Sequence, residues 1–132
     1  MVGEGVRTRM NLSIDLAWLL MVAEQKAPND PQVVDWGALV AAVSRHDAEI
    51  FGITVYDDPH TRAAALLQVL MHIPALEHSN ALFASAVAYG YLVACGLRVT
   101  ASPERVRELA RLVKAGAADV RDIADELERW TL

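Results

Sequence analysis

The chain has 132 residues, 54% of them hydrophobic, a length that suits one domain with a substantial core rather than two ordinary ones. Its formal net charge is −5, and residues 10–97 hold only three basic side chains against nine carboxylates. Because nucleic-acid binding depends on Lys and Arg side chains that neutralise phosphates, this charge pattern argues against a nucleic-acid partner.

The start of the chain and its single cysteine indicate a cytoplasmic protein. Residues 1–9 lack the apolar segment of a secretory signal, and Met10 is an alternative start. Cys95 lies in an apolar run, where we expect a small buried side chain in a reducing compartment. We expect residues 1–11 to form a tail and residues 12–132 to form one domain.

Two helices are predicted in the first 52 residues. Ser13 is a candidate N-cap for a helix that runs to about Lys26. Asp35 is placed to cap a second helix, which ends near Gly52. Four polar residues are expected on the exposed face of that helix, namely Arg45, His46, Asp47 and Glu49.

A short extended flap is predicted before the third helix. The flap alternates in polarity over four residues, Ile53, Thr54, Val55 and Tyr56. Asp58 followed by Pro59 is typical of a helix start, and we expect a helix over Thr61 to about His72 that Pro74 ends.

An uncharged run from Ala81 to Cys95 predicts a helix that is apolar nearly all round and therefore buried. Ser79 and Asn80 are candidate N-caps, and Gly96 suits the position after the last turn. At about fifteen residues the run is shorter than the roughly 20 that a membrane span needs. We expect a core helix and no membrane segment.

Two amphipathic helices are predicted at the end of the chain. Ser102 and Pro103 begin one that ends at Gly116, and Asp119 with Asp122 resembles a capping box that begins the other. All six long segments are thus helical. The sequence predicts an all-α class: a single compact domain of about six helices around a buried central helix, with a short flap.

The polar turn before the central helix is the candidate site. A buried helix start gathers unpaired backbone N–H groups and the positive end of the helix dipole, which favours a phosphate or carboxylate ligand. The candidate ligand-binding residues are Pro74, Glu77, Ser79, Asn80 and Ala81.

This order of elements resembles the Fic/Doc family, and most closely the short Doc-type toxins of bacterial toxin–antitoxin modules. The resemblance covers roughly residues 12–130 and rests on three stretches, D-W-G-A-L at 35–39, A-A-A-L-L at 63–67 and the closing segment 110–127. It implies phosphoryl or nucleotidyl transfer from a nucleoside triphosphate, such as ATP with magnesium, to a protein hydroxyl. It also implies an antitoxin partner.

The family signature H-x-F-x-[DE]-x-N-[GK]-R lies between the third helix and the buried one. In the family its His is the general base, its acidic residue holds the metal, and its Asn and Arg bind phosphate. Without gaps, only Asn80 matches the signature, and the His, Phe, acidic, Gly/Lys and Arg positions are Pro74, Leu76, His78, Ala81 and Leu82.

Transfer is therefore expected to be impaired, since a missing general base commonly costs roughly 10²–10⁴-fold in rate. No Lys or Arg lies between Ala63 and Leu97 to replace the arginine. His72 or His78 could act as a relocated base with Glu77 as a metal ligand, or these three could be ordinary turn and helix-end residues. Their spacing matches no regular zinc pattern, so we expect no zinc site.

Three hypotheses remain. The first is a Doc-like toxin with impaired transfer, and the second is an inactive Fic-fold binding module that uses the flap and the turn before Asn80. The third is a new activity built on His72, Glu77, His78 and Asn80. An antitoxin or another protein partner is expected, and a homo-oligomer is possible.

Overall fold

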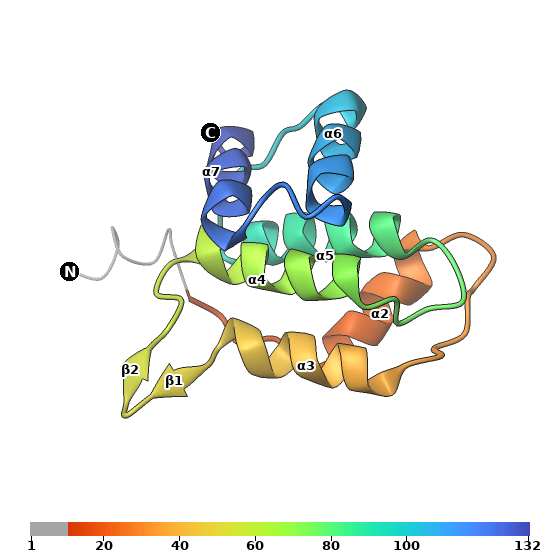
Figure 1. Cartoon of the computed structure of the whole chain (residues 1–132), viewed down its shortest axis with the longest axis horizontal. Helices are drawn as coiled ribbons and strands as arrows, with labels where there is room; N and C mark the ends of the chain where they lie inside the picture. The colour runs from red at the N-terminus through yellow and green to blue at the C-terminus, as the bar shows by residue number, and fades with distance from the viewer. Residues whose placement is uncertain (1–10) are drawn as a thin grey trace.

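The computed structural model describes residues 11–132, so all but the last residue of the predicted tail lies outside the described part. The described residues form six helices and one small hairpin, arranged as in Figure 1. In chain order they are α2 (Leu16–Lys26), α3 (Trp36–His46), β1 (Glu49–Ile50), β2 (Ile53–Thr54), α4 (Pro59–His72), α5 (Asn80–Ala94), α6 (Pro103–Lys114) and α7 (Val120–Trp130). The predicted all-α class, with about six helices and a short flap, is confirmed.

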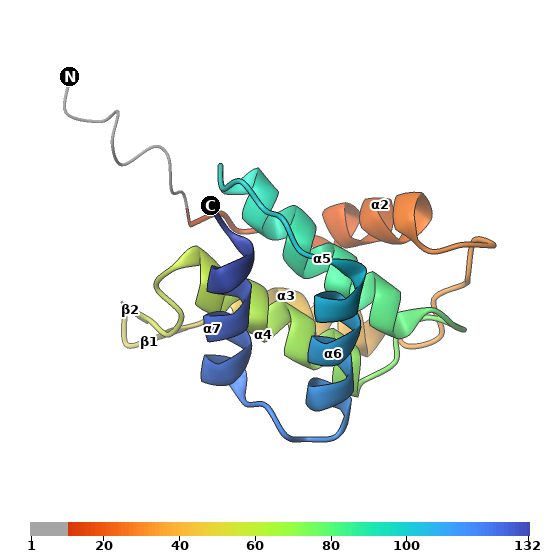
Figure 2. The ribbon, with the colours of Figure 1, turned by 90° about the horizontal axis from the view of Figure 1, so that it is seen from above.

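Helix α4 lies at the centre of the domain. It packs against α3, α5, α6 and α7, and ten of its 14 residues are buried. In Figure 1, α3 lies on one side of α4 while α6 and α7 stand on the other, and Figure 2 shows α5 running between α2 and the α6–α7 pair. Small side chains from Ala63 to Ala65 bring the neighbouring helices close to α4.

The prediction that the helix over 81–95 is buried all round is wrong. Helix α5 packs against α4, α2 and α6, and these neighbours cover only part of its circumference. Leu82, Tyr89 and Val93 are 48%, 39% and 49% exposed, and they follow one another at helical spacing. Helix α5 therefore buries one face in the core and shows an apolar stripe on the other.

Local capping explains where most helices begin. The N-cap side chain accepts a backbone N–H bond in α2, α3, α4, α6 and α7, through Asp15, Asp35, Asp58, Ser102 and Asp119. The predicted capping box of α7 and the prolines at the starts of α4 and α6 are confirmed. The prediction of Ser13 as the first cap is wrong, because Asp15 accepts the bond from the Trp18 N–H.

The second helix ends earlier than predicted, at His46 rather than near Gly52. The chain reverses there into the hairpin, in which Glu49 pairs with Thr54 and Ile50 with Ile53. Phe51 and Gly52 form the two-residue turn with positive φ angles of 53° and 78°, which is typical of tight hairpins. The predicted extended flap is thus confirmed at Ile53 and Thr54, and its partner strand is the segment predicted as helix.

His46 is also placed differently from the prediction, since its side chain is fully buried rather than on a polar surface. Its Nε2 accepts a hydrogen bond from the Ile14 N–H at 3.0 Å, and its Nδ1 contacts the Val43 carbonyl. Because Nε2 accepts, the ring is neutral with its proton on Nδ1.

None of the helices within residues 11–132 is long and apolar enough to cross a membrane.

Candidate functional site

The loop between α4 and α5, residues 73–79, carries the first part of the degenerate signature and is held by a second loop. The N–H groups of Val34 and Asp35 both donate to the Ala75 carbonyl, at 2.7 and 3.1 Å. The Glu77 N–H donates to the Gln32 carbonyl at 3.0 Å. The signature loop, as we call residues 73–79, is therefore fixed to the α2–α3 connection.

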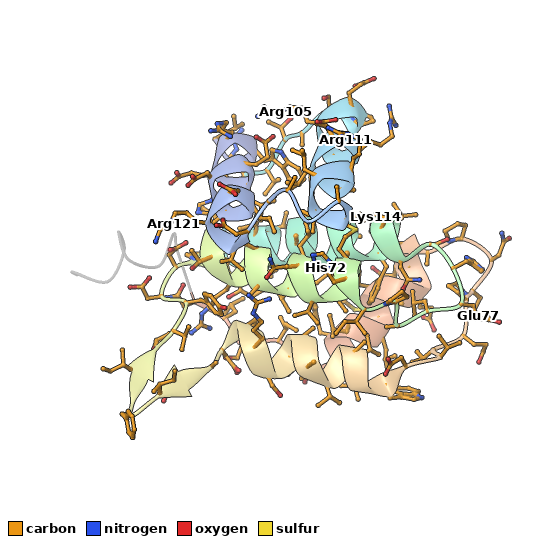
Figure 3. The ribbon with its side chains drawn as sticks, in the orientation of Figure 1. His72, Glu77, Arg105, Arg111, Lys114 and Arg121 are labelled. Carbon is orange, nitrogen blue, oxygen red and sulfur yellow. The ribbon has the colours of Figure 1, made fainter. Side chains whose placement is uncertain are left out.

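Glu77 reinforces this attachment with its side chain. Its Oε1 accepts the Gln32 N–H at 2.7 Å, so the two residues bond to each other in both directions. In Figure 3, Glu77 lies on the outer loop, apart from His72 and Lys114. The carboxylate acts as a clamp between two loops.

Asn80, the one retained signature residue, also bonds within the signature loop. Its Oδ1 accepts the N–H groups of Ala75 and Leu76 at 3.0 and 2.9 Å, and its Nδ2 donates to the Leu76 carbonyl at 2.9 Å. The side-chain amide thus holds the loop against the first turn of α5.

The first turn of α5 has no side-chain cap. Ser79 occupies the N-cap position with a left-handed φ of 66° and makes no capping bond, and Asn80 bonds to the preceding loop instead. The predicted capping role of these two residues is therefore not fulfilled. Backbone N–H groups at this helix start remain available to a ligand.

A cavity of about 350 Å³ lies in front of this helix start. It is lined by Met71, Pro74, Ser79, Asn80, Ala81, Leu82 and Lys114. The structure thus brings together four predicted site residues, Pro74, Ser79, Asn80 and Ala81. His72, Glu77 and His78 are absent from the lining, and the Nδ1 of His78 bonds to the Ser79 hydroxyl at 2.8 Å on the surface.

Sequence reasoning missed Lys114. It is the last residue of α6, and Figure 3 shows it where the end of α6 approaches the start of α5. No Lys or Arg lies within residues 63–97, and nothing in the local spacing links position 114 to this turn. Only the packing of α6 beside α5 brings Lys114 to the lining of the cavity.

The cavity does not fit a magnesium-dependent site. Mg²⁺ prefers carboxylate oxygens, and the lining contains no carboxylate. No group of three or more His, Cys, Asp or Glu side chains suited to a metal ion occurs within residues 11–132.

A second cavity, of about 430 Å³, continues along the exposed stripe of α5. It is lined by Lys26, Leu82, Ser85, Ala86, Tyr89, Gly90, Val93, Val106 and Trp130. Leu82 belongs to both cavities, so we call the two together the α5 groove. Its two charged residues, Lys26 and Lys114, are both basic, although the chain as a whole is acidic.

The flap belongs to a different cavity, of about 590 Å³, between the start of α4 and α7. Val55 and Tyr56 line it together with four carboxylates, Asp57, Asp58, Asp125 and Glu128. The flap and the turn before Asn80 therefore do not share a cavity. Four apolar side chains of the hairpin segment are exposed to solvent, those of Ile50, Phe51, Ile53 and Val55.

These features define a class: a small six-helix domain with a short hairpin, in which a signature loop leads into an uncapped helix. The chain is similar to the curated protein Toxin Doc of Mycolicibacterium smegmatis, with 36% identity over 98 residues. The match covers 73% of this chain and 75% of the relative. No protein-family profile matches the chain. On the strength of the curated relative, the chain belongs to the Doc toxin family.

Proposed function

We propose that this protein is the toxin component of a toxin–antitoxin pair, with impaired phosphoryl or nucleotidyl transfer. The Doc toxin relative supports the first part of the proposal. The second part rests on one observation: the cavity at the α5 start has Pro74 at the signature histidine position and no imidazole or carboxylate in its lining. A general base has to reach the proton that it abstracts, and no side chain of that kind does so here.

Weak anion binding is the chemistry that remains in this cavity. The uncapped N–H groups of α5 and the Lys114 ammonium offer donors to a phosphate. Leu82 stands at the signature arginine position, so the planar two-pronged contact that an arginine makes with phosphate is replaced by a single point charge. Nucleotides are therefore expected to bind loosely and to react slowly.

A second candidate is a catalytically inactive binding module, which would act by binding a partner rather than by modifying it. The clamping roles of Glu77 and Asn80 favour it, because both side chains hold the loop in place. The third hypothesis, a new activity of His72, Glu77, His78 and Asn80, has less support for the same reason.

The α5 groove suits the partner that a toxin of this family requires. Helix α5 has 15 residues and is roughly 22 Å long, so its apolar stripe matches about four turns of a partner helix. The flanking charges, Lys26 and Lys114, favour acidic side chains on that partner. We propose an acidic amphipathic helix of the antitoxin as the occupant.

Expression in a bacterial host, alone and together with a candidate antitoxin, would test the toxin proposal. Growth arrest that the antitoxin relieves is the expected result, and unimpaired growth at high expression would contradict it. Incubation of the purified protein and a cell extract with labelled ATP would test transfer. We expect no protein labelling above background, whereas strong labelling would overturn the claim of impairment.

The Pro74→His, His78→Asp, Leu82→Arg variant would test the position-by-position assignment. It restores three signature positions on the existing Asn80 and should bind phosphate more tightly than the parent. A folded variant with unchanged nucleotide affinity would contradict the gap-free alignment.

A further inference from the structure

Residues 11–15, which we call the N-terminal arm, are docked on three helices. The Leu12 carbonyl accepts the Tyr91 hydroxyl of α5 at 2.6 Å and the Nη1 of Arg62, on α4, at 3.0 Å. Two residues further on, the Ile14 N–H donates to His46 of α3 at 3.0 Å, and the Ile14 side chain is buried. The arm is thus part of the packed domain.

The hairpin segment, residues 48–56, is attached to the domain at its end. The Val55 N–H donates to the Ala48 carbonyl at 3.0 Å and closes the hairpin. The Tyr56 carbonyl accepts the Nε of Arg62 at 3.0 Å, and the Tyr56 hydroxyl accepts the Nε of Arg45 at 3.0 Å. One guanidinium therefore bonds to both the arm and the hairpin segment, next to an exposed bond from the Asn11 side chain to the Asp57 carbonyl at 2.8 Å.

Arg62 is an unusual residue for that role because it is only 7% exposed. No carboxylate within residues 11–132 forms an ion pair with it. Its guanidinium donates to the carbonyls of Leu12 and Tyr56 and also lies beside the Tyr91 hydroxyl of α5. A buried charge is costly unless hydrogen bonds satisfy it. The guanidinium thus obtains two of its acceptors from backbone segments that lie outside the helices.

The shape of the side chain makes this dependence mutual. A guanidinium is a rigid planar fork, so its Nε and Nη1 bonds are aimed together. If the arm leaves, the cation loses an acceptor and gains access to water, which weakens its hold on Tyr56. The same reasoning applies in the opposite direction.

We propose that Arg62 couples the N-terminal arm to the hairpin, so that lifting the arm from the domain releases the hairpin. This inference does not depend on the toxin activity. As a consequence, a partner that binds the arm also allows the hairpin to move. The hairpin carries the exposed side chains of Ile50, Phe51 and Ile53. Coupling of this kind is reciprocal, which makes it measurable from both ends.

Amide hydrogen exchange of the full chain under native conditions would test the coupling from the arm. Ile14→Ala removes the buried anchor of the arm without touching Arg62 or the hairpin. We expect residues 49–55 to exchange at least about tenfold faster, the effect of losing one hydrogen bond to a charged group. Leu109→Ala, a matched core truncation on α6, should leave hairpin exchange unchanged.

Two further variants identify the residue responsible. In an Arg62→Gln background, Ile14→Ala should add no further acceleration in the hairpin. Val55→Pro removes the bond to the Ala48 carbonyl, and it should speed exchange of the Ile14 N–H even though the arm is unaltered. This second variant needs no change at Arg62, so it decides the matter if Arg62→Gln does not fold.

The proposal is overturned by unchanged hairpin exchange in Ile14→Ala, by a full effect of Ile14→Ala in the Arg62→Gln background, or by unchanged Ile14 exchange in Val55→Pro. The toxicity assay is independent of these readings, so coupling and toxin function fail or succeed separately.

Discussion

The substitution Asn80→Ala removes three hydrogen bonds between the side-chain amide and the signature loop. With a net value of about 0.5–1.5 kcal/mol for each bond, it should lower the free energy of unfolding by about 2–4 kcal/mol. That is a large part of the roughly 5–15 kcal/mol typical of a domain. At roughly 3–5 °C per kcal/mol for a chain of this size, the melting temperature should fall by about 10 °C.

Urea denaturation followed by circular dichroism would measure this loss, with Asn11→Ala as the control. Asn11 is exposed and its side chain makes one bond, to the Asp57 carbonyl, so its replacement should cost no more than about 1 kcal/mol. A loss below about 1 kcal/mol for Asn80→Ala would refute the clamping role. Asn80 would then be better described as a side chain that is free to bind a ligand.

Three further outcomes are expected. Val87→Asp should abolish the folded circular dichroism spectrum, because it places an unpaired charge at a fully buried position of α5, and a normal melting curve would contradict the helix placement. Burial, with the nearby Arg62 charge, lowers the pKa of His46, so the unfolded chain binds the proton more readily below about pH 6.5. Stability should therefore fall as the pH drops through this range, and His46→Gln should flatten that dependence in urea titrations. Gly90→Ala should raise the melting temperature slightly, because alanine stabilises a helix by roughly 0.5–1 kcal/mol relative to glycine. The added Cβ would meet the Trp18 ring at 3.5 Å, an ordinary van der Waals contact. A lower melting temperature would contradict this reasoning.

Sequence reasoning succeeded where the physical cause is local. Asp58 with Pro59 and Asp119 with Asp122 determine helix starts through bonds to N–H groups two or three residues away. Such signals can be recognised from residues that lie close together in the sequence. The predicted cap at Ser13 is the exception, since Asp15, two residues further on, accepts the Trp18 N–H and caps the helix.

It failed where the cause lies far along the chain. Glu49 and Ile50 form a strand because Ile53 and Thr54 return beside them, and His46 is buried because Ile14 bonds to it from 32 residues away. Which face of α5 is covered depends on the packing of α2 and α6, and composition alone does not reveal that. Lys114 lies at the candidate site because of the same kind of long-range packing.

The central claim is that the α5 start has lost the groups needed for nucleotide transfer, and calorimetry with ATP and magnesium tests it most directly. A cavity without arginine, histidine or carboxylate should bind the nucleotide with a dissociation constant of about 1 mM or weaker, roughly −4 kcal/mol. Lys114→Ala should weaken that binding further, while Lys26→Ala, at the other cavity of the groove, should not. Micromolar binding would contradict the account and restore an active transferase as the better description.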